Sequence, residues 1–164
     1  MMVTPVRGHF KNVHGSLLFD PQTPAISDVE AVIDARGLWS GEPERDAHLR
    51  SADFLDVEQF PEIRFVSRSS QFASETEAAV SGELTLHGVT RSVVLDVRYL
   101  GQWQTPWWED GVDKGPRLRA GFVAKTRIDR RDFGVLWNST LARDGLVVGN
   151  EVHIGLDVEA ILEE

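Results

Sequence analysis

Apolar and polar residues alternate along most of the chain, which is the pattern of strands with one buried face. The clearest case is 80–86, where every second residue is apolar or glycine and the residues between are Ser, Glu and Thr. Successive side chains of a strand point to opposite faces, so this period of two predicts a half-buried strand. A similar alternation predicts further strands at 6–10, 13–20, 28–36, 62–65, 92–100, 119–125 and 152–160, with a less regular one at 135–141.

One segment, 43–59, departs from the alternation and has helical spacing instead. Pro43 suits the first position of a helix, where its missing N–H would have no partner anyway. Leu49, Ala52 and Leu55 then recur three residues apart, as on one face of a helix. The sequence therefore predicts one short helical insert near residues 43–59 in a chain that is otherwise β.

Two segments fit neither pattern and are predicted to be loops. Segment 69–78 is mostly polar, and segment 101–118 contains two prolines, three glycines and three tryptophans. Short alternating strands with turn residues between them are typical of an antiparallel sandwich or barrel. No internal repeat or linker is visible, so we expect a single domain over 1–164.

The inward positions decide between a sandwich and a barrel. About eight strands can close around a narrow interior that is either filled by side chains or holds one ligand. Small inward residues favour a cavity, although glycine in strands also marks bends and bulges, so both interpretations stay open. The small residues are Gly8, Gly15, Ala31, Ala35, Gly82, Ala120 and Ala124.

Composition restricts the function classes. There are 17 basic and 26 acidic residues, and a net charge of −9 repels nucleic acid. The chain has no cysteine, which excludes disulfides and thiolate metal sites. No apolar run approaches the ~20 residues of a spanning helix, so we expect no stable membrane insertion. No secretory signal is visible either, and the expected location is the cytoplasm.

Catalytic and metal motifs are not apparent. The five histidines have no i, i+4 pair, and no Gly-x-Ser-x-Gly sequence occurs. We therefore expect no enzyme, no metal and no cofactor. Two alternatives stay open: a small enzyme for an amphipathic substrate, with Arg45, His48 and Asp53 as its site, or a structural or stress-related interaction protein.

Several segments together resemble one known family. They are 6–10 (VRGHF), 44–54 (ERDAHLRSADF), 60–65 (FPEIRF), 82–90 (GELTLHGVT), 130–134 (RRDFG) with Trp137-Asn138, and 147–152 (VVGNEV). In this order they resemble the YceI-like proteins, which are described as polyisoprenoid-binding. The resemblance implies an all-β fold, an extended lipocalin-like antiparallel β-barrel of about eight strands. Family members begin with an extra strand, and Met1-Met2 stands where the turn after it would be, so that strand is expected to be absent.

The resemblance also implies a function. An isoprenoid lipid, either a polyprenyl diphosphate or a quinone, would be bound, sequestered or transported in the barrel cavity. Family members often form dimers, and an unpaired strand edge favours such pairing, so a homodimer is possible here. The sequence names neither the chain length nor the head group of the ligand.

Candidate ligand contacts follow from this implication. Arg45, Asp46, His48 and Arg50 are candidates to hold an anionic head group, or else they form an internal salt-bridge set that fixes the insert. Trp107 and Trp108 would fold over the mouth or touch a membrane or a partner. The candidate cavity walls, each of which is equally well plain core, are Phe10, Trp39, Phe54, Phe60, Phe65, Phe122, Phe133 and Trp137.

Overall fold

The computed structural model describes residues 4–20, 22, 25–140 and 146–163. In chain order its elements are β1 (His9–Phe10), β2 (Val13–Asp20), β3 (Ala25–Asp34), η1 (Ala35–Gly37), β4 (Leu38–Trp39), α1 (Pro43–Arg50), β5 (Glu62–Phe72), β6 (Glu77–Leu86), β7 (Val89–Glu109), β8 (Val112–Asp129), η2 (Arg130–Phe133) and β9 (Glu151–Ile161). The helical insert is confirmed: α1 is followed by turns that continue to residue 59.

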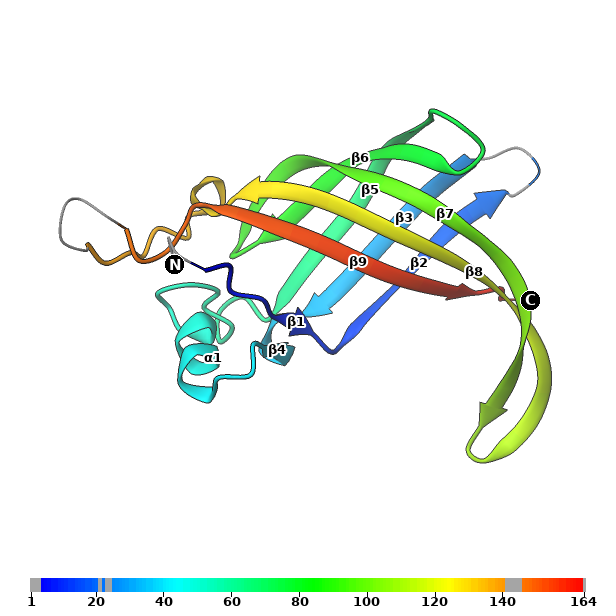
Figure 1. Cartoon of the computed structure of the whole chain (residues 1–164), viewed down its shortest axis with the longest axis horizontal. Helices are drawn as coiled ribbons and strands as arrows, with labels where there is room; N and C mark the ends of the chain where they lie inside the picture. Colours follow the sequence, from blue (N-terminus) through cyan, green and yellow to red (C-terminus); the bar gives the residue numbers. More distant parts are fainter. Residues whose placement is uncertain (1–3, 21, 23–24, 141–145, 164) are drawn as a thin grey trace.

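One antiparallel sheet dominates the molecule. Its strand order is β2-β3-β5-β6-β7-β8-β9, and each neighbouring pair is antiparallel. The sheet curls into a half-barrel, while β1 and β4 form a small separate pair beside α1 (Figure 1). The expected barrel-like, lipocalin-like fold is confirmed and a flat sandwich is excluded. The edges are β2 and β9, which do not pair with each other in the described residues.

β6 shows why the alternating pattern predicts this sheet well. Its burial alternates residue by residue from Ala78 to Leu86, with every second residue buried. β6 lies in the middle of the sheet, so its inner side chains meet the core, and its outer side chains meet solvent. The buried core next to α1 consists of Ala35, Val57, Ile63, Phe65, Val80, Leu84, Leu86, Ile128 and Phe133.

The prediction of a long loop at 101–118 is wrong. β7 and β8 continue through this segment as a two-stranded hairpin that extends past the rest of the sheet (Figure 1). Pro106 and Pro116 face each other there. Proline is tolerated because the extension has no outer neighbours that need its missing N–H. The turn residues Asp110 and Gly111 have φ of 51° and 77°, and this Asp-Gly pair was a hairpin signal in the sequence.

Three other boundaries also differ from the prediction. The strand at 6–10 is reduced to His9–Phe10, and the loop at 69–78 is reduced to 73–76. The strand at 135–141 is not formed within its described part, 135–140, which has only one isolated bridge at Thr140. In this segment two backbone carbonyl groups accept hydrogen bonds from a buried arginine rather than from a neighbouring strand.

Candidate functional site

The inner face of the half-barrel is the main candidate surface. Cross-strand register places Gly15 opposite Ala31, and Ala124 opposite both Val97 and Leu156, all on this face. Ala124 is buried, whereas Ala31, Val97 and Leu156 are only partly buried. Because β2 and β9 do not close the barrel, an apolar surface is left partly exposed between them.

Aromatic side chains close the end of this face that is far from α1. The ring of Phe19 in β2 lies 4.7 Å from that of Tyr99 in β7 and 5.2 Å from that of Phe122 in β8. The Tyr99 and Phe122 rings are 5.4 Å apart. These contacts connect the first strand of the sheet to strands near its other edge, which fixes the curl of the half-barrel.

A second aromatic group lies beside α1, at the other end. Phe54, Trp137 and His48 are in mutual contact, with ring centroids 4.6–5.3 Å apart. His48 Nε2 is 2.8 Å from Asp53 Oδ2, and both side chains are substantially exposed. Segment 44–54 of the sequence contains His48, Asp53 and Phe54. Trp137 lies far from this segment in the chain, and only the fold brings it into contact with them.

The other predicted head-group residues contact the backbone around β4. Asp46 is buried and accepts hydrogen bonds from the Ser40 N–H, at 2.9 Å, and from the Ser40 hydroxyl. Arg45 Nε donates to Ser40 Oγ at 2.8 Å, and its Nη2 donates to Ser40 O at 3.0 Å. Arg50 Nη2 donates to the carbonyl of Leu38. These three side chains therefore attach α1 to 38–40, while His48 pairs with Asp53.

The predicted wall residues fall into different environments. Phe65 and Phe133 belong to the core beside α1, and a Cβ on Gly82 would lie 2.5 Å from the Phe65 ring, so the Phe65 side chain fills the space next to Gly82. Trp39 is 47% exposed, and its ring centroid lies 4.9 Å from that of His9, with the two ring planes tilted by 49°. Of the others, Phe54 and Phe122 are buried, and Phe10, Phe60 and Trp137 are partly buried.

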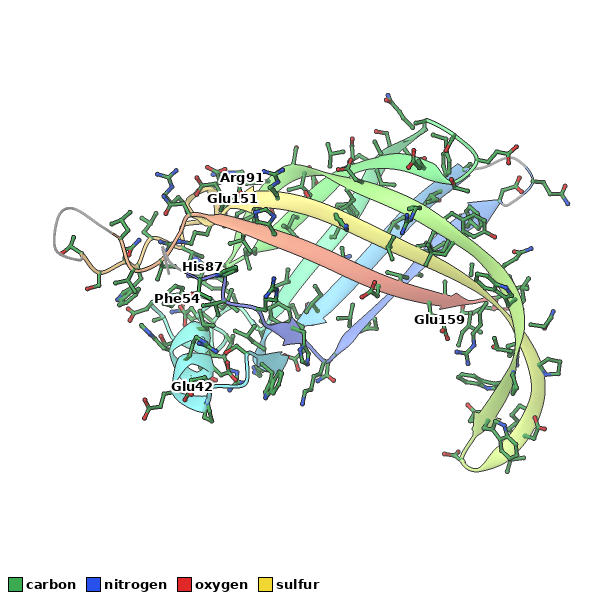
Figure 2. The ribbon with its side chains drawn as sticks, in the orientation of Figure 1. Glu42, Phe54, His87, Arg91, Glu151 and Glu159 are labelled. Carbon is green, nitrogen blue, oxygen red and sulfur yellow. The ribbon has the colours of Figure 1, made fainter. Side chains whose placement is uncertain are left out.

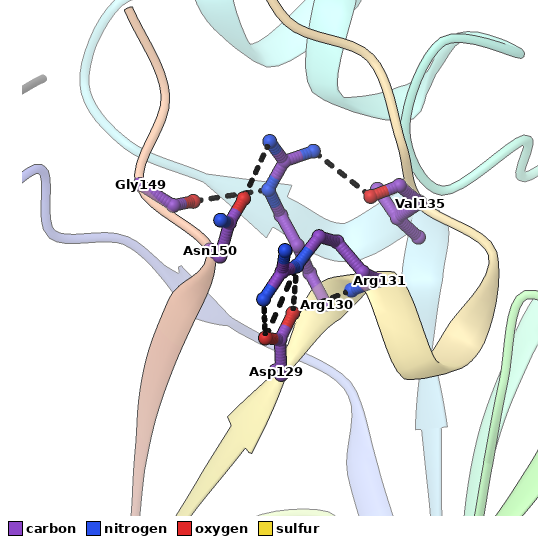
Figure 3. Close-up of polar contacts among 6 residues, drawn as sticks. All are labelled: Asp129, Arg130, Arg131, Val135, Gly149 and Asn150. Carbon is purple, nitrogen blue, oxygen red and sulfur yellow. Dashed lines mark hydrogen bonds and ion pairs between the residues drawn. The ribbon is translucent and has the colours of Figure 1, made fainter. Parts of the chain in front are cut away.

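Sequence reasoning missed the role of Arg130, which is only 6% exposed. Its guanidinium donates to the carbonyls of Gly149 (3.0 Å), Val135 (2.9 Å) and Trp137 (2.8 Å) and to Asn150 Oδ1 at 3.4 Å. Figure 3 shows the guanidinium between 149–150 and Val135. Burial lowers the pKa of Arg130 from its ordinary value. Arg130 thereby positions the segment that carries Trp137.

The adjacent Arg131 has a different environment, although the sequence gives no sign of it. Its side chain is exposed and pairs with both carboxylate oxygens of Asp129, the shortest contact being 2.5 Å. Hydrogen bonds from the Arg131 side chain and backbone lower the pKa of Asp129 to about 2. Only the carboxylate accepts these bonds, which is the physical cause of the shift.

No helix in the described ranges is long and apolar enough to span a membrane. Among the same residues, no three His, Asp or Glu side chains are grouped as metal ligands would be.

Comparisons with known proteins identify relatives across the chain. The family model of the YceI-like domain matches residues 1–160. A UPF0312 protein of Pseudomonas putida strain W619 is 38% identical over 130 residues, which are 79% of this chain, and a UPF0312 protein of Pseudomonas fluorescens strain SBW25 is 37% identical over 130 residues. The chain covers 64% of the length of each. These names assign no activity.

Solved structures support the fold at lower identity. The YCEI protein of Campylobacter jejuni is similar with a TM-score of 0.81 and 23% identity, over 100% of this chain and 89% of that one. Burkholderia cenocepacia BcnA gives a TM-score of 0.75 and 21% identity, over 97% of this chain and 90% of that one. With a family match over nearly the whole sequence, this chain belongs to the YceI-like family.

Proposed function

We propose that this protein binds an isoprenoid lipid, either a polyprenyl diphosphate or a quinone, against the inner face of the half-barrel, and that it sequesters or transports this lipid without chemical change. The observation that carries the proposal is an apolar inner face, partly exposed along its length and bounded by aromatic groups at both ends. Family membership supports a binding role for this face.

The energetics favour a long, branched hydrocarbon as ligand. Burial of one five-carbon isoprene unit contributes at most ~4 kcal/mol, at ~0.8 kcal/mol per CH₂. Ordering of the flexible tail and association itself offset a large part of this gain. A few units therefore give tight binding without a strong polar contact, which suits a face that has few charged side chains.

A second candidate function, a small enzyme acting on an amphipathic substrate, rests on the His48–Asp53 pair. A carboxylate 2.8 Å from an imidazole nitrogen holds the ring in one orientation, which a general base requires. The adjacent Phe54 and Trp137 would supply an apolar surface for the substrate. Loss of turnover in His48→Ala with unchanged lipid retention would favour this alternative over the carrier.

The test is extraction of the purified protein with organic solvent, followed by mass spectrometry of the small molecules recovered. We expect a polyprenyl compound or a quinone. Leu156→Trp fills the inner face from β9 and should reduce the amount recovered. Gly155→Trp is the matched control, because it places the same side chain where nothing lies within 4 Å. Recovery of no lipid from the native protein, or equal recovery from both variants, would refute the proposal.

A further inference from the structure

The wall of the half-barrel is split between β7 and β8 at the end near α1. β7 pairs with β6 from Val89 onward, but its pairing with β8 begins only at Asp96 opposite Lys125. The end of β8, from Thr126 to Asp129, pairs with β9 instead. The described segments 89–95 and 126–129 therefore do not hydrogen-bond to each other as strands, and in Figure 1 the end of β8 diverges from the start of β7.

A pocket of about 500 Å³ occupies this split. Its sides are 91–94 of β7 and 126–129 of β8. Arg68 of β5, Ser81 and Gly82 of β6, and Asp132 and Phe133 of η2 also line it. Side chains of Val93, Ile128 and Phe133 belong to the core or pack against it, so apolar groups are available between the strands. The pocket thus joins a polar rim to an apolar interior.

Backbone groups add polar partners to the split. In an antiparallel sheet, alternate residues direct their N–H and C=O groups towards each neighbouring strand. Along 89–95 and 126–129, the groups that face the split have no strand partner. Such groups require water or a ligand to complete their hydrogen bonds.

Arg91 is the rim cation available to a ligand. Two other rim arginines already have partners, since Arg68 pairs with Glu83 at 2.5 Å and Arg127 pairs with Glu151 at 3.5 Å. Arg91 is exposed and lies at the α1 end of the sheet (Figure 2).

The contacts of Arg91 leave most of its donors available. Its Nη1 donates to the carbonyl of Thr90 at 3.1 Å, and within the described part of the chain it forms no ion pair. On the rim, the carboxylate of Asp129 is paired with Arg131. Asp132 is then the rim carboxylate that would repel an anion at Arg91.

We propose that this split is a binding site for an amphipathic anion. The guanidinium of Arg91 binds the phosphate or carboxylate of this ligand, and the apolar part of the ligand lies against Val93 and Ile128. Ser92 borders the same split from the opposite face of β7. A protein with a net charge of −9 attracts anions only through a local arrangement of this kind. The site opens through the wall between β7 and β8, although Val93, Ile128 and Phe133 also border the core, and the variants below distinguish it from the surface of the proposed function.

Calorimetric titration with octyl phosphate tests the charge contact. Arg91→Gln should raise its Kd about tenfold, the effect of losing one hydrogen bond from a charged group. Arg98→Gln is the matched control, because Arg98 is an exposed arginine on the same strand outside the pocket. Leu156→Trp should leave the Kd unchanged. An equal effect of Arg98→Gln and Arg91→Gln, or no binding to the native protein, would overturn the proposal.

The absence of cysteine allows a test of position. Ser92→Cys introduces the only thiol of the chain, and its alkylation by a maleimide should be slowed by octyl phosphate more than by octanol or inorganic phosphate. Ser69→Cys on β5, outside the pocket, should be alkylated at the same rate with and without ligand. Equal protection by inorganic phosphate would show a plain phosphate site and refute an amphipathic ligand. Equal alkylation of Ser92→Cys in all mixtures would refute the location.

Discussion

Replacement of Arg130 by alanine should destabilise the protein strongly. The native guanidinium donates to three carbonyl groups and one side-chain amide at 2.8–3.4 Å (Figure 3). A hydrogen bond from a charged donor contributes about 1.5–3 kcal/mol, but the four are not additive, because freed carbonyls near the surface regain water. Each carbonyl group that stays buried without a partner costs about 1–3 kcal/mol, so the expected loss in the free energy of unfolding is about 3–5 kcal/mol.

Urea denaturation followed by tryptophan fluorescence measures this loss directly. In thermal unfolding, a domain of this size loses about 2–4 °C per kcal/mol, so the expected decrease in Tm is roughly 6–20 °C. Arg130→Lys should recover little of the stability, because one ammonium group does not span carbonyls on both sides of the guanidinium. Trp137 should become more exposed to quenchers, since Arg130 binds its carbonyl.

Arg131→Ala is the control, because this neighbour has the same charge and lies in the same 3-10 turn but is exposed, and among the described residues its side chain bonds to Asp129 alone. Its effect should be clearly smaller than that of Arg130→Ala. If the two variants unfold at the same urea concentration, or if Arg130→Ala is as stable as the native protein, the reasoning about the buried guanidinium is wrong.

Two further predictions concern Asp129 and Gly82. Arg131 lowers the pKa of Asp129 from 3.8 to about 2, so the Asp129 carboxylate stabilises the fold above its unfolded pKa. This contribution is lost as the pH falls from about 4 to 2. In Asp129→Asn the free energy of unfolding should therefore depend less on pH in that window, as measured by urea denaturation at each pH. Gly82→Ala should cost about 1–3 kcal/mol, measured in the same way, because a Cβ would lie 2.5 Å from both the Phe65 ring and the carbonyl oxygen of Val66.

Each of these has a control in the same sheet. Asp157→Asn removes an exposed carboxylate from β9 that forms no ion pair with the described residues, and this variant should keep the native pH dependence of stability between pH 4 and 2. Gly155→Ala places a Cβ in open space and should leave stability nearly unchanged. A native pH profile in Asp129→Asn, or equal stability of the two alanine variants, would contradict the respective prediction.

The alternating pattern determined the strands and their inner faces wherever a strand has one face in the core. β6 illustrates this, since its buried positions are those that the sequence indicated. The start of the insert was equally clear, because Pro43 is the first residue of α1. The helix ends at Arg50, however, so Ala52 and Leu55 of the predicted helical spacing lie in the turns that follow it. The hairpin at Asp110-Gly111 was locally encoded too, but the prolines and tryptophans around it obscured the signal.

The sequence determined less about the candidate sites, because those depend on residues far apart in the chain. Arg130 and Arg131 are identical in type and adjacent, and only the packing of 135–138 and 149–150 around one of them makes it a buried donor. Likewise, no local pattern states that β7 is separate from β8 before Asp96, since each strand keeps its alternation and its other neighbour. Residue type and period fix which face of a strand is apolar, whereas the curl of the sheet decides which strands part and which aromatic groups meet across it.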